Sequence, residues 1–215
     1  MFTDCFTEFS KHKKMSEQQH GKPWDAQLAC KLVYPLRNTS VTPNHLTSIR
    51  LLFGVFAAAG FAAGSYLWTN IGALCFVVSN FMDHTDGELA RLTGKITSYG
   101  HYYDLASDAI VNIILFVGIG IGLMDSNYGW LALPMGLIAG IAVAAIFHMR
   151  NKIEQSIGKH EARQPHFSGI EAEDVLYLLP VISYLGWLNP FLLLATLGAP
   201  AFAIYVWFEY SRLEK

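Results

Sequence analysis

The sequence predicts an all-α integral membrane protein with six transmembrane helices. Two observations support this fold class. Of the 215 residues, 53% are hydrophobic and only 15% are charged, and the apolar residues gather in long runs that are nearly free of charge. The lysines and arginines lie outside these runs, on one side of the path that the runs imply. A helix needs about 20 predominantly apolar residues to cross a bilayer core, so runs of this length indicate transmembrane helices.

The six crossings follow from where the apolar runs begin and end. The first run covers residues 51–82, which is longer than one crossing, and Gly64, Ser65, Thr69 and Asn70 interrupt it. We therefore expect two helices joined by a tight turn in this region. The expected crossings are 44–64, 67–93, 98–124, 129–153, 171–188 and 190–212, of which the fifth is short.

The positive charges give an independent test of this count. When the loops are assigned alternately to the two sides, all 15 lysine and arginine residues lie on one side. The opposite turns, at 64–70, 125–129 and 186–190, contain none. Cytoplasmic loops of membrane proteins carry an excess of lysine and arginine, so we expect both termini in the cytoplasm.

Residues 1–40 are expected to form a cytoplasmic segment that precedes a six-helix transmembrane domain of residues 41–215. The segment lacks the basic region, apolar region and small-residue cleavage site of a signal peptide. An apolar residue recurs every four positions near its end, with lysines nearby, which predicts an interfacial amphipathic helix on the membrane surface. These residues are Trp24, Leu28, Leu32 and Leu36. The alternative is a poorly ordered tail with a few apolar residues.

Small residues recur at four-residue spacing within the expected helices, which lets transmembrane helices approach closely. The pairs are Gly54 with Ala58, Gly60 with Gly64, Gly118 with Gly122, and Gly136 with Gly140. They predict either a tightly packed bundle or the seam of a homodimer.

The remaining composition excludes other classes. Three widely spaced cysteines imply neither a disulfide framework nor a metal knuckle. The net charge is −2 and no basic face with interleaved aromatic residues occurs, so we expect no nucleic-acid partner.

One stretch, DHTDGELARLTGKITSYGHYYDLASD at residues 83–108, is unusually polar for its apolar surroundings. Asp83 and Asp86 are three residues apart near the end of the second expected helix, and Asp104 and Asp108 are four apart near the start of the third. Each pair shares a helix face, and an intervening turn would bring the two faces together. Carboxylates gathered in a confined space repel one another unless a cation neutralises them. Oxygen-only ligands suit magnesium, manganese or calcium.

The residues after Asp86 favour a ligand that carries phosphate. Gly87 and Ala90 are small and leave space beside the helix backbone, and Arg91 offers a forked guanidinium suited to phosphate. Magnesium is usually bound by one or two carboxylates together with substrate phosphates. The stretch therefore predicts a metal-bound phosphate substrate at the cytoplasmic interface.

This stretch resembles the signature of the CDP-alcohol phosphotransferase family, D-x2-D-G-x2-A-R-x8-G-x3-D-x3-D. All eight fixed positions are matched, by Asp83, Asp86, Gly87, Ala90, Arg91, Gly100, Asp104 and Asp108. At average residue frequencies, such a match at a given start has a chance on the order of 10⁻¹⁰. The stretch TPNHLT at residues 42–47 is similar to the P-N-x-L-T stretch that often opens the first transmembrane helix of the family.

The resemblance implies that the transmembrane domain of residues 41–215 is catalytic, and that the protein is a phospholipid-synthesising transferase, a CDP-alcohol phosphatidyltransferase. Family members displace CMP from a CDP-linked donor with a hydroxyl acceptor. By this resemblance, one or two Mg²⁺ or Mn²⁺ ions would be held by Asp83, Asp86, Asp104 and Asp108. Asp108 would also act as the general base. The CDP moiety would be contacted by Gly87, Ala90, Arg91, Gly100 and Asn44.

Two groups of residues point to different acceptors. The end of the fourth expected helix and the following loop carry His148, Arg150, Lys152 and Arg163, which would suit a polyol phosphate such as glycerol 3-phosphate or an inositol phosphate. For each residue alone, the general excess of positive charge in cytoplasmic loops is the simpler explanation. Asp174 and its acidic neighbours would instead suit a neutral or cationic acceptor, although acidic residues are common in a first helical turn.

Three functions stay open at this point. The leading one is transfer of a phosphatidyl group from CDP-diacylglycerol, a membrane-embedded donor, to a polyol or polyol phosphate, and the compact chain favours it. The second keeps the site but has diacylglycerol attack CDP-choline or CDP-ethanolamine. The third is a divalent-cation transporter, since acidic residues within membranes also mark ion pathways. A pathway would need acidic residues at several depths, whereas beyond the acidic stretch only Asp125 lies at the far turn.

Overall fold

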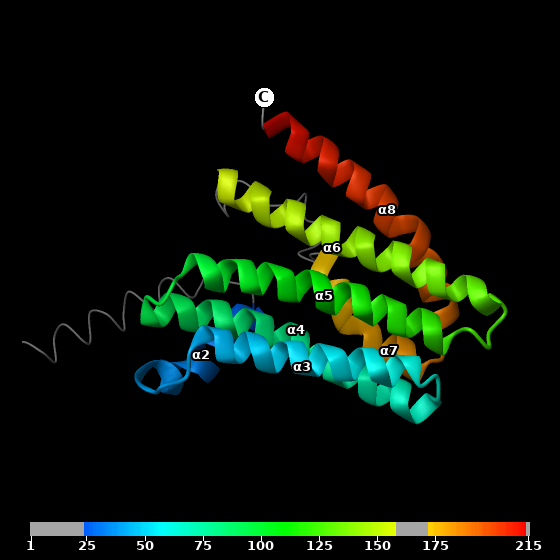
Figure 1. The fold of residues 1–215 in the computed structure, drawn as a ribbon, viewed down its shortest axis with the longest axis horizontal. Coiled ribbons are helices and arrows are strands. Elements are labelled where there is room, and N and C mark those ends of the chain that lie inside the picture. Colours follow the sequence, from blue (N-terminus) through cyan, green and yellow to red (C-terminus); the bar gives the residue numbers. More distant parts are fainter. Residues whose placement is uncertain (1–23, 158–171, 214–215) are drawn as a thin grey trace, which may run out of the picture.

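The computed structural model describes residues 24–157 and 172–213, and all regular structure within them is helical (Figure 1). In chain order the elements are α2 (Trp24–Val33), η1 (Tyr34–Asn38), α3 (Pro43–Ala62), α4 (Tyr66–Thr93), α5 (Ser98–Gly122), η2 (Gly129–Leu131), α6 (Ala132–Ile157), η3 (Ala172–Leu178), α7 (Leu179–Tyr184) and α8 (Leu188–Leu213).

The helix boundaries follow local sequence signals. α3 begins at Pro43, whose fixed φ suits a first helical position, and the backbone N–H of Thr42 donates to His45 Nδ1 at 3.3 Å. α3 ends at Ala62 and α4 begins at Tyr66, so the long apolar run divides into two helices as predicted. Gly64 lies in the turn between them with φ +69°, a conformation that glycine adopts at no steric cost.

Among the described residues, four helical segments are long and apolar enough to cross a membrane: α3, α5, η2 with α6, and α8. α4 is 28 residues long, but polar residues such as Asn70, Asn80 and Asp83 lower its hydropathy. η3 and α7 provide a shorter apolar stretch, Val175–Tyr184. Residues 24–157 and 172–213 therefore contain four candidate crossings, whereas the sequence predicted six over the chain.

The long helices lie side by side (Figure 1), and their contacts do not follow their order in the sequence. α3 lies between α4 and α5, α5 packs on α6, and α6 packs on α8. α2 and α7 both pack against α4. Successive long helices run in opposite directions, so the start of α3, the end of α4, the start of α5 and the end of α6 lie at one end of the bundle. We call this the Gly94 end, after the glycine between α4 and α5.

Glycines allow this close packing. A Cβ at Gly60 would lie 2.8 Å from the Cα of Gly72 on α4, and a Cβ at Gly54 would lie 2.6 Å from Val111 Cγ2 on α5. A Cβ at Gly118 would collide with the backbone carbonyl of Ala58 on α3. These small residues therefore build a tight bundle within one chain, which is one of the two alternatives that their spacing predicted.

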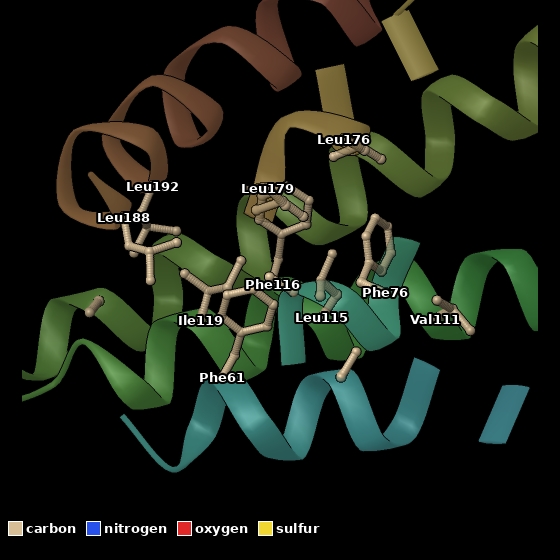
Figure 2. Close-up of a cluster of buried hydrophobic side chains, with 14 residues drawn as sticks. Phe61, Phe76, Val111, Leu115, Phe116, Ile119, Leu176, Leu179, Leu188 and Leu192 are labelled. Carbon is tan, nitrogen blue, oxygen red and sulfur yellow. The ribbon is translucent and has the colours of Figure 1, made fainter. Parts of the chain in front are cut away.

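The apolar core lies between α3, α4, α5, the first half of α6, η3, α7 and the start of α8. Figure 2 shows Phe61 of α3, Phe116 and Ile119 of α5 and Leu179 of α7 pointing into one cluster. The rings of Phe116 and Phe191 stack at a centroid distance of 5.9 Å. This core lies in the half of the bundle away from the Gly94 end, and it fixes the relative depth of the helices there.

Large apolar side chains also cover the outer surface. Leu194, Leu197, Trp68, Trp130 and Trp187 are all more than half exposed. Such a surface suits lipid, and exposed tryptophans near the turns are typical of membrane–water interfaces. Together with the four apolar helices, this surface confirms the predicted membrane protein, whereas the sidedness of the termini stays a prediction.

The N-terminal helix expected on the membrane surface corresponds to α2. Val33 packs with Leu46 of α3 and Leu89 of α4, while Leu28 and Leu32 are about half exposed. The stripe predicted to face lipid is therefore open on the described part of α2, and its membrane contact stays a prediction.

Candidate active site

Three carboxylates from two helices converge at the Gly94 end. Asp83 comes from α4, and Asp104 and Asp108 come from one face of α5. One oxygen from each lies within 4.8 Å of the others. The predicted meeting of the two acidic helix faces is present for these three residues.

The turn between α4 and α5 produces this arrangement. α4 ends at Thr93, and Gly94 follows it in the left-handed conformation with φ +66°, a common way to end a helix. The side-chain oxygen of Thr97 accepts from the backbone N–H of Gly100 at 3.0 Å, which caps the start of α5. The chain therefore reverses within a few residues and places the two acidic helix ends side by side.

Arg50 of α3 binds all three carboxylates. Its Nη1 donates to Asp83 and, at 2.9 Å, to Asp104, and its Nη2 donates to Asp108. The Arg50 side chain is 2% exposed, whereas the three carboxylates are between 29% and 33% exposed. The guanidinium therefore lies on the interior side of the carboxylates, and their other side faces solvent.

The backbone at Arg50 is held against the neighbouring helix α4. The Ser79 hydroxyl of α4 donates to the backbone carbonyl of Arg50 at 2.9 Å, and Ser79 is fully buried. From the sequence, Arg50 is one of the 15 positive charges expected on the cytoplasmic side, with no predicted role in the site. A signal was present, because an arginine that follows an expected helix start by two turns needs a carboxylate partner at membrane depth.

Asp86 lies apart from the three-carboxylate group. It is 4% exposed, and its Oδ2 accepts from the hydroxyl of Thr47 at 2.6 Å. Among the described residues, the carboxylate group that could hold a metal contains Asp83, Asp104 and Asp108 but not Asp86. Asp86, the fourth predicted metal ligand, therefore accepts a hydrogen bond from Thr47 of α3 in this structure. Its role as a metal ligand stays a prediction.

The residues expected to contact the CDP moiety lie at the same end of the bundle. A Cβ at Gly87 would lie 3.5 Å from Arg91 Nη2, and Arg91 donates to the buried Glu88 at 2.9 Å while its own side chain is 52% exposed. A Cβ at Gly100 would lie 3.1 Å from Asn44 Oδ1, so α3 and α5 approach closely there. Ala90 is half-buried on α4.

A cavity of about 280 Å³ opens beside Asp108, between α5 and α6. Asp108 and His148 line it together with apolar side chains such as Leu105, Ile113 and Phe147. The structure therefore brings one of the residues predicted to bind the acceptor to the same cavity as the predicted base.

The other residues predicted to bind the acceptor are placed differently. Arg150 of α6 donates to Glu209 of α8 at 3.3 Å, so it contributes to the contact between these helices. Lys152 is exposed at the end of α6. Arg163 lies outside the described residues, and Asp174 lies in η3 with a side chain that is not among those described.

The donor set suits a hard divalent cation. All three converging groups are carboxylates, and their oxygens are close enough to share one ion. Oxygen-only sites favour magnesium or manganese over zinc, which prefers nitrogen and sulfur ligands. The residues present therefore fit the metal that the sequence predicted.

A comparison with protein families matches most of this chain. The family model described as CDP-alcohol phosphatidyltransferase matches residues 40–208, which include α3 to α7, most of α8 and every described residue of the site. The chain belongs to this family. The resemblance first seen in a 26-residue signature thus extends over most of the chain.

Two similar proteins are named archaetidylinositol phosphate synthase. The one from Pyrococcus horikoshii is 35% identical over 88 residues, which are 40% of this chain and 45% of that protein. The one from Methanothermobacter thermautotrophicus is 27% identical over 125 residues, 58% of this chain and 60% of that protein. A CDP-diacylglycerol–glycerol-3-phosphate 3-phosphatidyltransferase from Rickettsia felis is 32% identical over 69 residues, 32% of this chain and 38% of that protein. The chain spans about half the length of the curated relatives it matches.

Proposed function

We propose that this family member transfers a phosphatidyl group from CDP-diacylglycerol to a hydroxyl acceptor, with release of CMP, and that the reaction depends on a divalent metal ion. The observation that carries the proposal is the convergence of Asp83, Asp104 and Asp108 within a stretch that fills all eight signature positions. The product would be a membrane phospholipid, so the proposed role is phospholipid biosynthesis.

Asp83, Asp104 and Asp108 would hold the Mg²⁺ or Mn²⁺ ion, with Asp86 close by on the same helix end. When bound, the ion neutralises charge on the diphosphate and stabilises the leaving CMP. The nucleotide would lie over the exposed side of the carboxylates. Gly87 and Gly100 would leave space for the nucleotide, and Ala90 would line that space. Arg91 and Asn44 would donate hydrogen bonds to the nucleotide. The exposure of Arg91 supports this assignment.

Asp108 would act as general base. The acceptor oxygen would bond to the lipid-linked phosphorus, the phosphorus–oxygen bond to CMP would break, and CMP would leave with the electron pair. The acceptor proton would move to the Asp108 carboxylate. The cavity beside Asp108 supports this role, because a base must lie within hydrogen-bond reach of the proton that it removes.

We propose a phosphorylated polyol as the acceptor. The names of the three relatives specify an inositol phosphate lipid or glycerol 3-phosphate. His148 would bind the acceptor at the cavity beside Asp108, and Lys152 is exposed on the same helix end. Arg150 would contribute less, because it donates to Glu209.

The proposal includes the predicted membrane topology. α4 and the η3–α7 segment would complete six crossings, both termini would be cytoplasmic, and the catalytic domain would be residues 41–215. Residues 1–40 would precede it, with α2 on the membrane surface. The active site would open at the cytoplasmic face, because the turn that contains Lys95 lies at the Gly94 end. A homodimer is also expected.

Purified full-length protein tests the function directly. It should release CMP from CDP-diacylglycerol in the presence of Mg²⁺ or Mn²⁺ and an acceptor, and EDTA should stop the release. The acceptors to compare are glycerol 3-phosphate, inositol phosphate, inositol, serine and choline. A parallel reaction with CDP-choline and diacylglycerol tests the second function. Release of CMP only in that parallel reaction would reverse the assignment of donor and acceptor.

A further inference from the structure

The charge around the three carboxylates is only partly balanced by the protein. When ionised, Asp83, Asp104 and Asp108 carry three negative charges, and Arg50 contributes one positive charge. Asp86 adds a fourth carboxylate near Arg50, so Arg50 alone leaves a net negative charge that a divalent cation can neutralise. Carboxylates this close cannot all remain ionised without a counter-charge, so Arg50 is what allows them to gather when no ion is bound.

The position of Arg50 makes this role specific. Its guanidinium is buried beneath the carboxylates, while their opposite side is open to solvent. The two nitrogens that point at the carboxylates bind all three of them, which the compact ammonium of a lysine could do less completely. An ion that approaches from the exposed side meets three preassembled oxygens with a fixed positive charge behind them.

We propose that Arg50 is a built-in counter-cation of the metal site. It keeps Asp83, Asp104 and Asp108 together before an ion binds, and its positive charge weakens the binding of that ion. The inference rests on the proposed function only in taking a divalent metal as the ligand of this site. Arg50 is therefore a positioning residue that contributes stability to the metal-free protein and limits its affinity for metal.

The test compares the full-length protein with Arg50→Gln, both purified in detergent, without any donor or acceptor. Mn²⁺ binding is measured by electron paramagnetic resonance, and thermal unfolding by circular dichroism. In EDTA, the variant should unfold at a lower temperature, because its carboxylates lack a counter-charge. It should bind Mn²⁺ about tenfold more tightly or better, because the positive charge within a few ångströms is gone. Mn²⁺ should therefore raise its unfolding temperature more than that of the unaltered protein.

Two further variants separate the causes. Lys95→Gln removes a positive charge from the exposed turn at the same end, where salt screens it, and should leave Mn²⁺ affinity within about twofold. Arg50→Lys keeps the positive charge but loses the forked guanidinium. This variant should bind Mn²⁺ with nearly the affinity of the unaltered protein, and it should still unfold at a lower temperature in EDTA. If Arg50→Gln does not fold, the lysine variant decides the question, and a large change in its Mn²⁺ affinity would overturn the proposal.

Equal or weaker Mn²⁺ binding by folded Arg50→Gln would also overturn it. That failure is distinct from a failure of the proposed function. Suppose that the unaltered protein releases CMP but Arg50→Gln does not bind Mn²⁺ more tightly. Only the proposed role of Arg50 would then be wrong. Tighter Mn²⁺ binding by the variant, in a protein that releases no CMP with any donor, would leave the role of Arg50 in place and remove the proposed reaction.

Discussion

Thr47 of α3 donates a buried hydrogen bond of 2.6 Å to Asp86 of α4. The two residues are 39 positions apart, and each belongs to a different stretch that the sequence singled out. Thr47 closes the stretch that opens α3, and Asp86 is the second aspartate of the signature. Three residues beyond Thr47, Arg50 binds the other three aspartates of the signature. One face of α3 therefore holds all four carboxylates in place.

We expect Thr47→Val to destabilise the protein. Valine has nearly the same shape as threonine but no hydroxyl, so it would leave the buried Asp86 carboxylate without this donor, at a cost of about 1–3 kcal/mol. For a chain of this size, the thermal unfolding midpoint should fall by roughly 2–10 °C. Thr93→Val is the matched control, because the Thr93 hydroxyl donates only to the Leu89 carbonyl one turn earlier in its own helix. Equal midpoints for the two variants would contradict this account.

We expect Asp108→Asn to reduce CMP release by about 10²–10⁴-fold, the usual contribution of a general base. An amide of the same size cannot accept the acceptor proton. Metal-dependent binding of CDP should remain detectable, because Asp83 and Asp104 are unchanged, and equilibrium dialysis with labelled CDP would measure it. Asp125→Asn, in the exposed turn at the far end, is the control and should retain full turnover. Near-normal turnover by Asp108→Asn would remove Asp108 from the role of base.

We expect His148→Ala to raise the KM for the acceptor about tenfold, with a smaller effect on the KM for the CDP-linked donor. The reason is that His148 lines the cavity beside Asp108, away from the residues proposed to contact CDP. Arg150→Gln should change the acceptor KM less, because Arg150 donates to Glu209 across α6 and α8. Initial rates at varied acceptor concentration would measure both. The opposite ranking of the two variants would place the acceptor outside this cavity.

We expect Gly60→Ala to destabilise the bundle by about 1–3 kcal/mol, because an added methyl group would force α3 and α4 apart. The Cβ of alanine would lie 2.8 Å from the backbone of Gly72, a contact that no side-chain movement can relieve. Gly198→Ala is the matched control, since no atom beyond its chain neighbours and the adjacent backbone of its own helix lies within 4 Å of the position of its Cβ. Unfolding of both variants in detergent would be followed by circular dichroism. A midpoint for Gly60→Ala as high as that of the control would contradict the close approach of these helices.

Much of the fold was predictable because its cause is local. Apolar runs, Pro43 and the glycines at turns mark where helices begin and end, and the bounds of α3, α4, α5, α6 and α8 lie close to those of five expected helices. The remaining expected helix, 171–188, is instead divided between the 3-10 helix η3 and the short α7. The pairing of Asp104 with Asp108 also follows from helical periodicity alone. The crossing status of α4 was less predictable, because a helix that carries the acidic site is polar along part of its length and so departs from the apolar pattern of a simple span.

The sequence by itself determined the helical class, the family and the identity of the acidic residues, since these depend on composition, periodicity and spacing within short segments. Only the tertiary structure decided that Arg50 binds Asp83, Asp104 and Asp108, that Thr47 donates to Asp86, and that His148 shares a cavity with Asp108. These contacts join residues on different helices. They depend on how deeply α3 lies against α4 and α5, which the packing of glycines and core side chains sets and no local pattern encodes.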